Sequence, residues 1–301
     1  MQQRLCAAGS PVASFMTSPP KSSQTTVSRA LAASGLIPFE AKILLGHVLR
    51  RDRAWLAAHG DQPMTAHEAK AFDALARRRR GGEPIAYLTG RREFYGLDLE
   101  VTPGVLIPRP ETELLVELAL VRIDASEQTE VLDLGSGSGA IALAIASERP
   151  HSAVLGVDVS AAAVALARRN ASRLHVGNVV FIESDWFSAV PGKRYDAIIA
   201  NPPYVAAGDE HLSQGDLRFE PPAALAAGAD GLNAIRTIIA GAGAFLSPGA
   251  WLLIEHGYDQ ADAVLAMLRD AQFSDVQSRR DLAGIPRTVL ARMQGPIEPR
   301  P

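Results

Sequence analysis

The second half of the chain alternates two hydrophobic patterns. Short apolar runs, which suit buried strands, are separated by segments in which apolar residues recur every three or four positions, as on one helix face. We expect strands at 131–134, 154–158, 179–183, 196–200 and 251–255, a terminal strand pair at 276–280 and 288–293, and helices at 140–147, 161–170, 234–246 and 261–271. Strands separated by helices predict an α/β fold with a doubly wound, mainly parallel sheet.

The segment 25–80 shows only the helical pattern. Its apolar residues recur at three- and four-residue steps, and Pro38 and Pro63 interrupt it. Thr65, followed three residues later by Glu68, is the signature of a capping box, which begins the last helix of this segment. The pattern predicts a small bundle of three or more short helices.

The segment between these two regions has no long periodic pattern. A pair of glycines ends the helical region, and residues 87–101 alternate loosely, with Gly96 near a turn, which is typical of a hairpin. The prolines within 106–113 fix a rigid start for the next helix, and we expect Arg109 to pair with a neighbouring glutamate. The expected divisions are a disordered tail at 1–24, a helical domain at 25–86, a hairpin-like linker at 87–108, an α/β domain at 109–294 and a second tail at 295–301.

Composition narrows the class of protein. The chain has 301 residues, 47% of them hydrophobic and 21% charged, with a net charge of -3 and a pI near 6.2, so no overall electrostatic attraction to nucleic acid is expected. Its only cysteine is Cys6, which excludes a disulfide framework and a cysteine-based zinc site and fits a reducing cytosol. No signal peptide or membrane-length apolar run is evident, and Met16 is an alternative start. We expect a cytoplasmic protein without a membrane partner.

The stretch that carries the chemistry is Asn201-Pro202-Pro203-Tyr204, directly after the strand expected at 196–200. Two consecutive prolines lack the N–H groups that a ladder needs, so the strand ends there. The turn presents an amide side chain, free backbone carbonyls and an aromatic face. Ligands of open α/β sheets bind just beyond the carboxyl ends of strands, so these acceptors suit a substrate with an NH2 group. An ordinary proline-rich loop is the alternative.

A glycine-rich loop follows the first strand of the α/β region and opens a helix. Its residues are Asp133, Gly135, Ser136, Gly137, Ser138 and Gly139. Glycines let the backbone approach a ligand closely, and the helix amides point outward. With Ala140 the loop also satisfies the dinucleotide fingerprint, so a nicotinamide enzyme and a purely structural turn are alternatives.

Two further strand ends carry polar residues. Asp158 ends the second strand, where its carboxylate can accept both hydroxyls of a ribose. Asp185 and Trp186 follow the third strand, where a polar group can meet an adenine amino group and the indole can wall the pocket. Together these positions outline a site for an adenosine. A nicotinamide enzyme has no evident use for the motif at 201–204.

These motifs together resemble the PrmC/HemK family, the N5-glutamine methyltransferases that modify peptide chain release factors. The resemblance covers roughly 25–293. The matching segments are 87–94, 106–113, 132–142, 184–187, 201–204, 215–221 and 255–257, which read YLTGRREF, LIPRPETE, LDLGSGSGAIA, SDWF, NPPY, GDLRFEP and EHG.

The resemblance implies the fold and the activity. It implies a class I, Rossmann-like methyltransferase domain preceded by a helical substrate-recognition domain. S-adenosylmethionine is the implied cofactor, S-adenosylhomocysteine the product, and the glutamine of a release factor's Gly-Gly-Gln motif the methyl acceptor. The implied cofactor residues are Asp133, the loop 135–139, Asp158, Asp185, Trp186 and Asn201. No metal is implied, and we expect a monomer.

The resemblance also implies roles within the motif at 201–204. The side-chain oxygen of Asn201 and the backbone carbonyl of Pro202 would accept the two N–H groups of the glutamine amide. Tyr204 would pack against the amide plane, beside Pro203. His256 is a possible later proton acceptor, although a structural hydrogen bond is the commoner role for such a residue.

Two other functions stay open at this stage. The same motif occurs in amino methyltransferases that act on DNA adenine, against which the acidic pI and the lack of a basic recognition region argue. A non-catalytic binding module could also keep this fold. The run Arg77 to Arg80 is either a solvated helix end or a patch for an acidic protein or ribosomal RNA.

Overall fold

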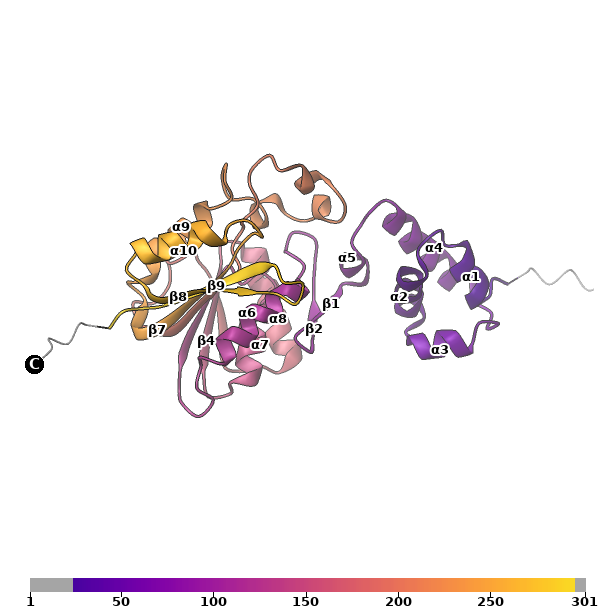
Figure 1. Cartoon of the computed structure of the whole chain (residues 1–301). Coiled ribbons are helices and arrows are strands. Elements are labelled where there is room, and N and C mark those ends of the chain that lie inside the picture. Colours follow the sequence, from indigo (N-terminus) through magenta and orange to yellow (C-terminus); the bar gives the residue numbers. More distant parts are fainter. Residues whose placement is uncertain (1–23, 296–301) are drawn as a thin grey trace, which may run out of the picture. The chain divides into compact units, whose positions relative to one another are not determined.

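The computed structural model describes residues 24–295 (Figure 1). Cys6, the alternative start at Met16 and nearly all of both predicted tails lie outside these residues. The chain divides into two compact units, one up to Arg77 and the other from Arg78 onward. The functional roles assigned to separate domains stay predictions.

The first unit is helical, as the sequence pattern predicts. Its helices are α1 (Val27–Ala33), α2 (Pro38–Leu49), α3 (Arg53–Ala58) and α4 (Ala66–Arg80), the last of which runs across the division. The predicted capping box is present at the start of α4. Thr65 N donates to Glu68 Oε2 over 2.7 Å, and Glu68 N donates to Thr65 Oγ1 over 3.2 Å. Leu44, Leu45 and Phe72 are fully buried in this unit.

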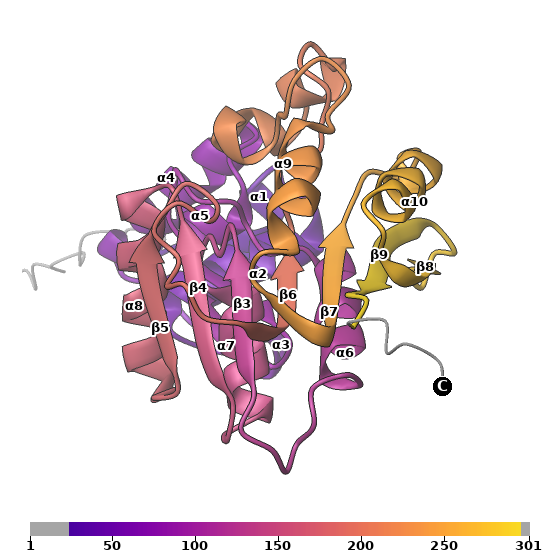
Figure 2. The same cartoon turned by 90° about the vertical axis from the view of Figure 1, so that its left-hand side faces the viewer.

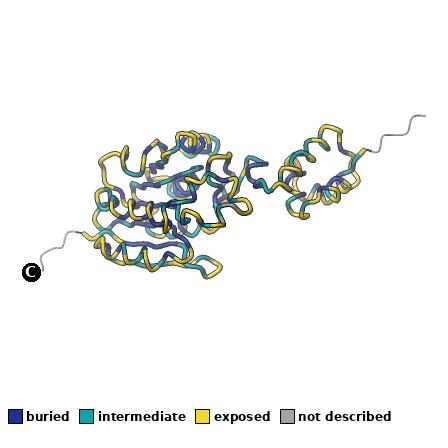
Figure 3. The backbone as a smooth tube through the Cα atoms, turned by 90° about the horizontal axis from the view of Figure 1, so that it is seen from above, coloured by how far each residue is buried: buried dark blue, intermediate teal, exposed yellow. Residues whose placement is uncertain are grey.

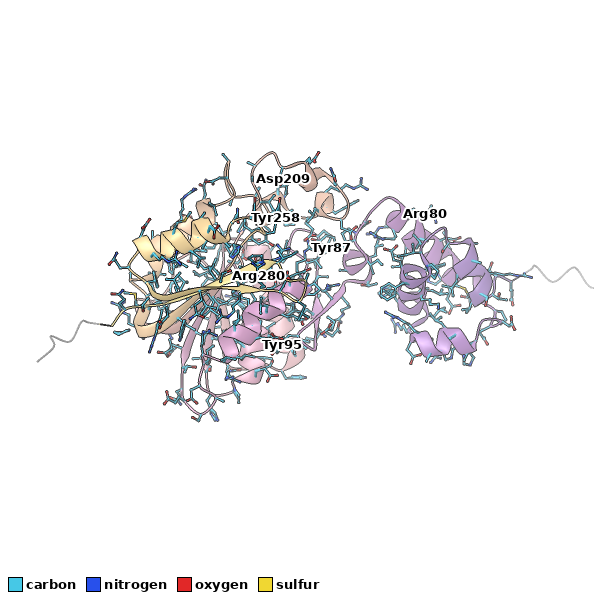
Figure 4. The ribbon with its side chains drawn as sticks, viewed as in Figure 1. Arg80, Tyr87, Tyr95, Asp209, Tyr258 and Arg280 are labelled. Atoms are coloured by element: carbon cyan, nitrogen blue, oxygen red, sulfur yellow. The ribbon has the colours of Figure 1, made fainter. Side chains whose placement is uncertain are left out.

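A short helix and a hairpin begin the second unit. The helix α5 (Ile85–Thr89) precedes β1 (Arg91–Phe94) and β2 (Leu97–Glu100), which pair antiparallel. Tyr95, which is labelled in Figure 4, and Gly96 form the two-residue turn between these strands, with φ of 50° and 75°. The predicted hairpin is therefore present, but the loose alternation at 87–89 belongs to a helix.

Seven strands form the main sheet, as predicted. They are β3 (Glu130–Leu134), β4 (Ala153–Asp158), β5 (Val179–Glu183), β6 (Tyr195–Ala200), β7 (Leu246–Glu255), β8 (Ser274–Arg280) and β9 (Pro286–Arg292). Their order is β5-β4-β3-β6-β7-β9-β8, and β9 runs antiparallel to both of its neighbours (Figure 2). The chain moves outward in one direction from β3 and in the other from β6. The boundary between β3 and β6 is therefore the switch point at which such sheets bind ligands.

Helices cover both faces of this sheet. The helices α6 (Glu113–Leu120), α7 (Ala140–Glu148) and α8 (Ala161–Leu174) pack on one face, and α9 (Asn233–Ala242) and α10 (Ala261–Asp270) on the other. Figure 3 shows buried backbone, in dark blue, running through the interior of the second unit. Along β3, Val131 belongs to the first core, whereas Leu132 and Leu134 belong to the second. Burial on both faces explains why the strands read as continuous apolar runs.

Several element ends differ from the sequence prediction. The helix expected to reach residue 246 ends at Ala242, and the strand expected to start at 251 starts at Leu246. Pro248 and Gly249 are residues that usually interrupt a strand. Here they remain within β7, because the pairing of β7 with β6 shifts its register at this point. No element was expected at 205–232, which holds η2 (Glu210–Ser213), η3 (Leu217–Phe219) and η4 (Pro222–Ala224). One further short helix, η1 (Pro110–Thr112), leads into α6.

Gly156 on β4 provides a test of the packing below the switch point. It pairs with Phe181 on β5, and a Cβ added at Gly156 would lie 2.5 Å from the Phe181 ring. We expect Gly156→Ala to lower the free energy of unfolding by about 1–3 kcal/mol, because a fully buried ring has little room to move. Gly177→Ala, which would meet nothing within 4 Å, is the matched control. Urea denaturation measures both, and equal stabilities would contradict this packing.

Candidate active site

A cavity of about 350 Å³ lies at the carboxyl edge of the sheet, over the switch point. Most of the site residues predicted from the sequence line it: Gly135, Ser136, Gly137, Ser138, Asp158, Asp185, Trp186, Asn201 and Pro203. Asp133, Gly139, Pro202 and Tyr204 do not line it. Each of these four residues lies one or two positions from a lining residue along the chain.

The glycine-rich loop is fixed by strand β4. The backbone N–H groups of Gly135 and Ser136 each donate to the Val157 carbonyl over 2.8 Å, and Gly137 N donates to Asp158 Oδ2 over 2.9 Å. Gly137 has a φ of 55°, in the left-handed region that glycine tolerates best. These three hydrogen bonds therefore fix the course of the loop along the cavity.

Gly139 has a packing role instead of a lining one. It precedes α7 with a φ of 85°, and a Cβ there would come within 3.1 Å of Leu143, Ala167 and Phe181. A side chain at this position would push the start of α7 away from the sheet. Gly139 thus sets where the helix begins and, through it, where the loop lies.

Asp133 is a buried carboxylate beneath the loop. Its side chain is fully buried, Oδ2 accepts the Ala142 N–H over 3.2 Å, and Oδ1 has no hydrogen-bond partner among the described residues. Burial raises the pKa of Asp133 to about 7, with a smaller contribution from the charge of Asp158. A buried acceptor without a partner is costly, so this oxygen suits a donor brought by a ligand or a water.

Asp158 is held rigidly at the cavity edge. Ser160 N donates to Oδ1 and Gly137 N donates to Oδ2, each over 2.9 Å. An ionised carboxylate has about four acceptor positions, so each oxygen keeps capacity for one more donor. Asp158 can therefore receive two neighbouring hydroxyls, as the sequence predicts.

Trp186 forms part of the cavity wall in a strained conformation. Its φ of 48° is unusual for a bulky residue, and such strain persists only where the surroundings enforce it. Here Ser184 enforces it: its hydroxyl donates to the Trp186 carbonyl over 2.8 Å and accepts the Ala189 N–H over 2.9 Å. Asp185, just before it, also faces the cavity. In this conformation the Trp186 indole and the Asp185 carboxylate both line the same wall of the cavity.

The motif at 201–204 is held by three different elements. Asn201 Nδ2 donates to Thr112 Oγ1 over 3.0 Å, which leaves Asn201 Oδ1 free to accept another donor. Tyr204 is anchored at both ends, because its hydroxyl donates to Glu255 Oε1 over 3.2 Å and its carbonyl accepts from Gln260 Nε2 over 2.9 Å. Burial raises the pKa of Tyr204, so the phenol stays protonated.

The segment before α6 is tied to the loop after this motif by Glu220. This buried carboxylate accepts the Ile107 N–H over 3.0 Å and pairs with the Arg109 guanidinium. Arg109 does pair with a glutamate, but the prediction that this would be a neighbouring residue is wrong, because Glu220 lies 111 residues further along the chain. Asp216 accepts from Arg79 over 2.8 Å and Arg218 donates to the Gly81 carbonyl. All three residues of this loop have structural partners.

His256 lies away from the cavity. It is fully buried, its Nδ1 bonds to the Gly257 carbonyl over 2.7 Å, and burial lowers its pKa. The structural alternative given for this residue agrees with these contacts. Sequence reasoning missed Thr112 and Glu255 as parts of the site. Glu255 could have been found by the rule that pointed to Asp158, because both are carboxylates that end strands of the sheet.

Across residues 24–295, no group of three or more histidine, cysteine, aspartate or glutamate side chains is arranged to hold a metal ion. Within the same residues, no helix combines the length and the apolar character needed to cross a membrane.

Known families and relatives match most of the chain. The family described as "PrmC N-terminal domain" matches residues 24–90, and the one described as "Methyltransferase small domain" matches residues 110–217. A "Release factor glutamine methyltransferase" of Burkholderia pseudomallei is 52% identical over 91% of this chain and 99% of its own. The Escherichia coli protein of the same name is 47% identical over 84% of this chain and 91% of its own.

A solved structure shares the fold. A methyltransferase from Pyrococcus furiosus has a TM-score of 0.52 at 20% identity, covering 73% of this chain and 97% of its own. The resemblance to the PrmC/HemK family seen in the sequence motifs is confirmed by the closer relatives. Because the similarity extends over nearly the full length of those relatives, the chain belongs to the release factor glutamine methyltransferase family.

Proposed function

We propose that this protein transfers a methyl group from S-adenosylmethionine to the side-chain amide nitrogen, N5, of the glutamine in the Gly-Gly-Gln motif of peptide chain release factors. S-adenosylhomocysteine is the second product. The observation that carries the proposal is the fixed amide of Asn201 at the cavity. Its NH2 group is used by Thr112, so its oxygen is left to accept an N–H of an incoming amide. The function named for the relatives requires such an acceptor.

The cavity suits an adenosine-bearing cofactor. A carboxylate with two unused acceptor positions, Asp158, lies beside an open glycine-rich loop, and Asp185 and Trp186 offer a polar group and an aromatic wall. Ile141 and Val159 add apolar surface. When bound, S-adenosylmethionine supplies an electrophilic methyl group on a sulfonium. We assign its ribose to Asp158 and its adenine to the wall formed by Asp185 and Trp186.

The contribution of the protein to the reaction is orientation. A glutamine amide nitrogen is a poor nucleophile because its lone pair is delocalised into the carbonyl. Asn201 Oδ1 and the Pro202 carbonyl accept its two N–H groups, and Tyr204 packs against the amide plane. Fixing the geometry of two reactants can supply up to about 7–11 kcal/mol. No strong base is needed beforehand, since the proton can leave to water afterward.

A DNA adenine amino group has the same NH2 chemistry, so DNA is the competing substrate. The net charge of -3 argues against it. The test is mass spectrometry of a purified release factor incubated with enzyme and cofactor, with a parallel reaction on an adenine-containing oligonucleotide. A gain of one methyl group on the Gly-Gly-Gln glutamine supports the proposal. Methylation of the oligonucleotide alone overturns it. We infer that the enzyme works in the cytoplasm, as a monomer.

Asp158→Ala tests the cofactor assignment. We expect cofactor affinity to fall by about two to four decades, because two charge-assisted hydrogen bonds are lost and each is worth about 1.5–3 kcal/mol. The rate of the chemical step at saturating cofactor should change less. Calorimetry measures the affinity, and Asp196→Ala, which alters a carboxylate at the opposite end of the sheet, is the control. Unchanged affinity in Asp158→Ala contradicts the assignment.

Asn201→Ala tests the amide acceptor. We expect the single-turnover rate at saturating cofactor and release factor to fall by about one to two decades, because a buried N–H that loses its acceptor costs about 1–3 kcal/mol. Asn201→Asp should also be slower, although less so, because it keeps an acceptor but loses the donor to Thr112. Variants that react as fast as the parent would show that Asn201 does not orient the substrate.

Removal of residues 1–77 tests the recognition role of the helical unit. The cut falls at the division between the two units and keeps Arg79, which pairs with Asp216. Phe94 is the first residue along the chain that lines the cavity, so the truncation removes no lining residue. We therefore expect cofactor affinity to stay within about twofold of the full chain. Methylation of full-length release factor should be impaired. A normal rate with the truncated protein would exclude a recognition role.

A further inference from the structure

Gln260 is a buried amide that joins three segments at the carboxyl edge of the sheet. It follows the turn after β7, directly precedes α10 and is 8% exposed. Its Nε2 donates to the Tyr204 carbonyl over 2.9 Å and to the Asp230 carbonyl over 3.2 Å. Its Oε1 accepts the Gly257 N–H over 2.8 Å. Both hydrogens of the NH2 group and the oxygen are therefore used inside the protein.

The turn after β7 fixes the orientation of this amide. The Gln260 backbone N–H donates to the Gly257 carbonyl over 3.1 Å, so the backbone and the side chain of Gln260 both bond the same residue. With its oxygen turned to the Gly257 N–H, the side-chain amide must point its NH2 group at the other two carbonyls. The flipped amide would place its oxygen against two carbonyl oxygens and would lose all three side-chain bonds, which is costly in a buried site.

The two carbonyls bound by Gln260 belong to the two ends of one loop. Residues 205–232 leave the motif at 201–204 and return to it. Val205 N donates to the Leu225 carbonyl over 2.8 Å, and Ala227 N donates to the Val205 carbonyl over 3.0 Å. The residues of this loop that line the cavity are Pro221, Ala223 and Ala224. Gln260 therefore closes the base of a loop that forms part of the cavity wall.

Gly231 allows the loop to approach the motif this closely. Its φ is 73°, in the left-handed region that glycine tolerates best. A Cβ added there would overlap the Tyr204 carbonyl oxygen and would lie 2.8 Å from Gln260 Nε2. Both the backbone conformation and the space therefore require glycine at this position. The returning end of the loop packs directly against the bond between Gln260 and Tyr204.

We propose that Gln260 is a positioning residue that fixes the backbone of the motif at 201–204 for methyl transfer. The inference rests on the proposed function, which assigns the Pro202 carbonyl and the Tyr204 ring to the substrate amide. Neither Gln260 nor its three partners line the cavity, so Gln260 acts through Tyr204. Gln260 holds the carbonyl of Tyr204 and Glu255 holds its hydroxyl, and together the two bonds set the backbone and the ring.

The first experiment is Gln260→Met in the full chain, which keeps the length of the side chain but removes its donors and its acceptor. We expect the single-turnover rate at saturating cofactor and release factor to fall by at least about tenfold, because the substrate amide is no longer aimed at the methyl group. Cofactor affinity, measured by calorimetry, should stay within about twofold. Gln128→Met is the matched control and should react like the parent, since Gln128 is exposed and precedes β3 at the opposite edge of the sheet.

Gln260→Glu distinguishes a hydrogen-bond donor from a side chain that only fills space. A carboxylate at this position opposes the two carbonyl oxygens, whereas the protonated acid can donate to one of them. The rate of this variant relative to the parent at the same pH should therefore rise as the pH falls toward the raised pKa of a buried carboxyl group. The relative rate of Gln260→Met should not change with pH. A relative rate of Gln260→Glu that is equally independent of pH contradicts a role for the donor.

The ratio to the parent removes the titration of the groups that both variants keep. The segments packed around Gln260 carry the side chains of Tyr204, Asp230 with its partner Arg236, Glu255, His256, Tyr258, Asp259 and Asp262. All of them are present in the parent, in Gln260→Met and in Gln260→Glu. A pH dependence that appears only in Gln260→Glu therefore belongs to the new carboxyl group.

Gly231→Ala tests the same contact from the side of the loop. Its single-turnover rate should match that of Gln260→Met within about threefold, because the added methyl group pushes Tyr204 and Gln260 apart. Gly208→Ala is the matched control, since Gly208 has a φ of 95° in the same loop but a Cβ there would meet nothing within 4 Å. The double variant of Gly231→Ala and Gln260→Met should be little slower than either single one, because both act on one contact. If the two effects multiply, or if Gly231→Ala reacts like Gly208→Ala, the proposal is wrong.

A readout without turnover distinguishes this proposal from the proposed function. Tyr204-Val205 is the only Tyr-Val pair in the sequence, so isotope labels on tyrosine carbonyl carbons and valine nitrogens give one carbonyl–nitrogen NMR signal. A hydrogen bond to a carbonyl oxygen shifts the signal of its carbon downfield. We therefore expect an upfield shift of the Tyr204 carbonyl in Gln260→Met and Gly231→Ala, and no shift in Gln128→Met.

The outcomes of the two readouts separate the two claims. An unchanged carbonyl signal in Gln260→Met overturns the positioning role, whatever the substrate. A shifted signal together with a normal methylation rate also overturns it, because the contact then does not serve the reaction. If the parent does not methylate a release factor, a shifted signal rejects the proposed function but retains the hold of Gln260 on Tyr204. If Gln260→Met fails to fold, Gly231→Ala decides both readouts.

Discussion

The burial of β3 and β6 on both faces is the constraint on which the site depends. Helices cover each side of these strands, so their side chains must be apolar along nearly their whole length. Polar side chains with a function can then appear only where the strands end. Parallel strands end at the same edge, which brings Asp133 beside the turn after β3 and Asn201 beside the turn after β6. The two turns flank the switch point and the cavity above it.

The segment before α6, which is not part of the sheet, lines another side of the cavity at the carboxyl edge. Its lining residues are Val105, Leu106, Pro108, Arg109 and Thr112. It is held by Glu220, which binds the Ile107 amide and the Arg109 guanidinium. Tyr87 adds a second tie by donating its hydroxyl to the Val105 carbonyl over 2.7 Å. These ties set the position of Thr112 and so the position from which it meets Asn201. Loop geometry is thus fixed by buried hydrogen bonds and an ion pair.

The site also contains features that work against stability. Two buried carboxylates, Asp133 and Glu255, have pKa values raised to about 7 by burial, and Trp186 has a strained backbone. A buried carboxylate with a raised pKa binds protons more tightly in the folded state, so its contribution to stability declines as pH rises from about 4 to 7. Such groups are retained where position and charge serve a purpose, which agrees with their clustering at one edge of the sheet.

The sequence alone determined the sheet, its helices and most of the cavity lining. Its hydrophobic periods are local properties, and Asp158, Asp185 and Asn201 follow apolar strands whose carboxyl ends must meet. The tertiary structure decided which polar residues pair with one another, and no local sequence pattern contains that information. The pairing of Arg109 with Glu220, and the hydrogen bond from the Ile107 amide to the same carboxylate, connect residues more than a hundred positions apart. The sequence shows that Arg109 and Glu220 are charged, but which donor meets which acceptor depends on how the loops pack. For the same reason, the sequence placed Tyr204 beside a substrate, whereas only the folded chain shows its hydroxyl held by Glu255.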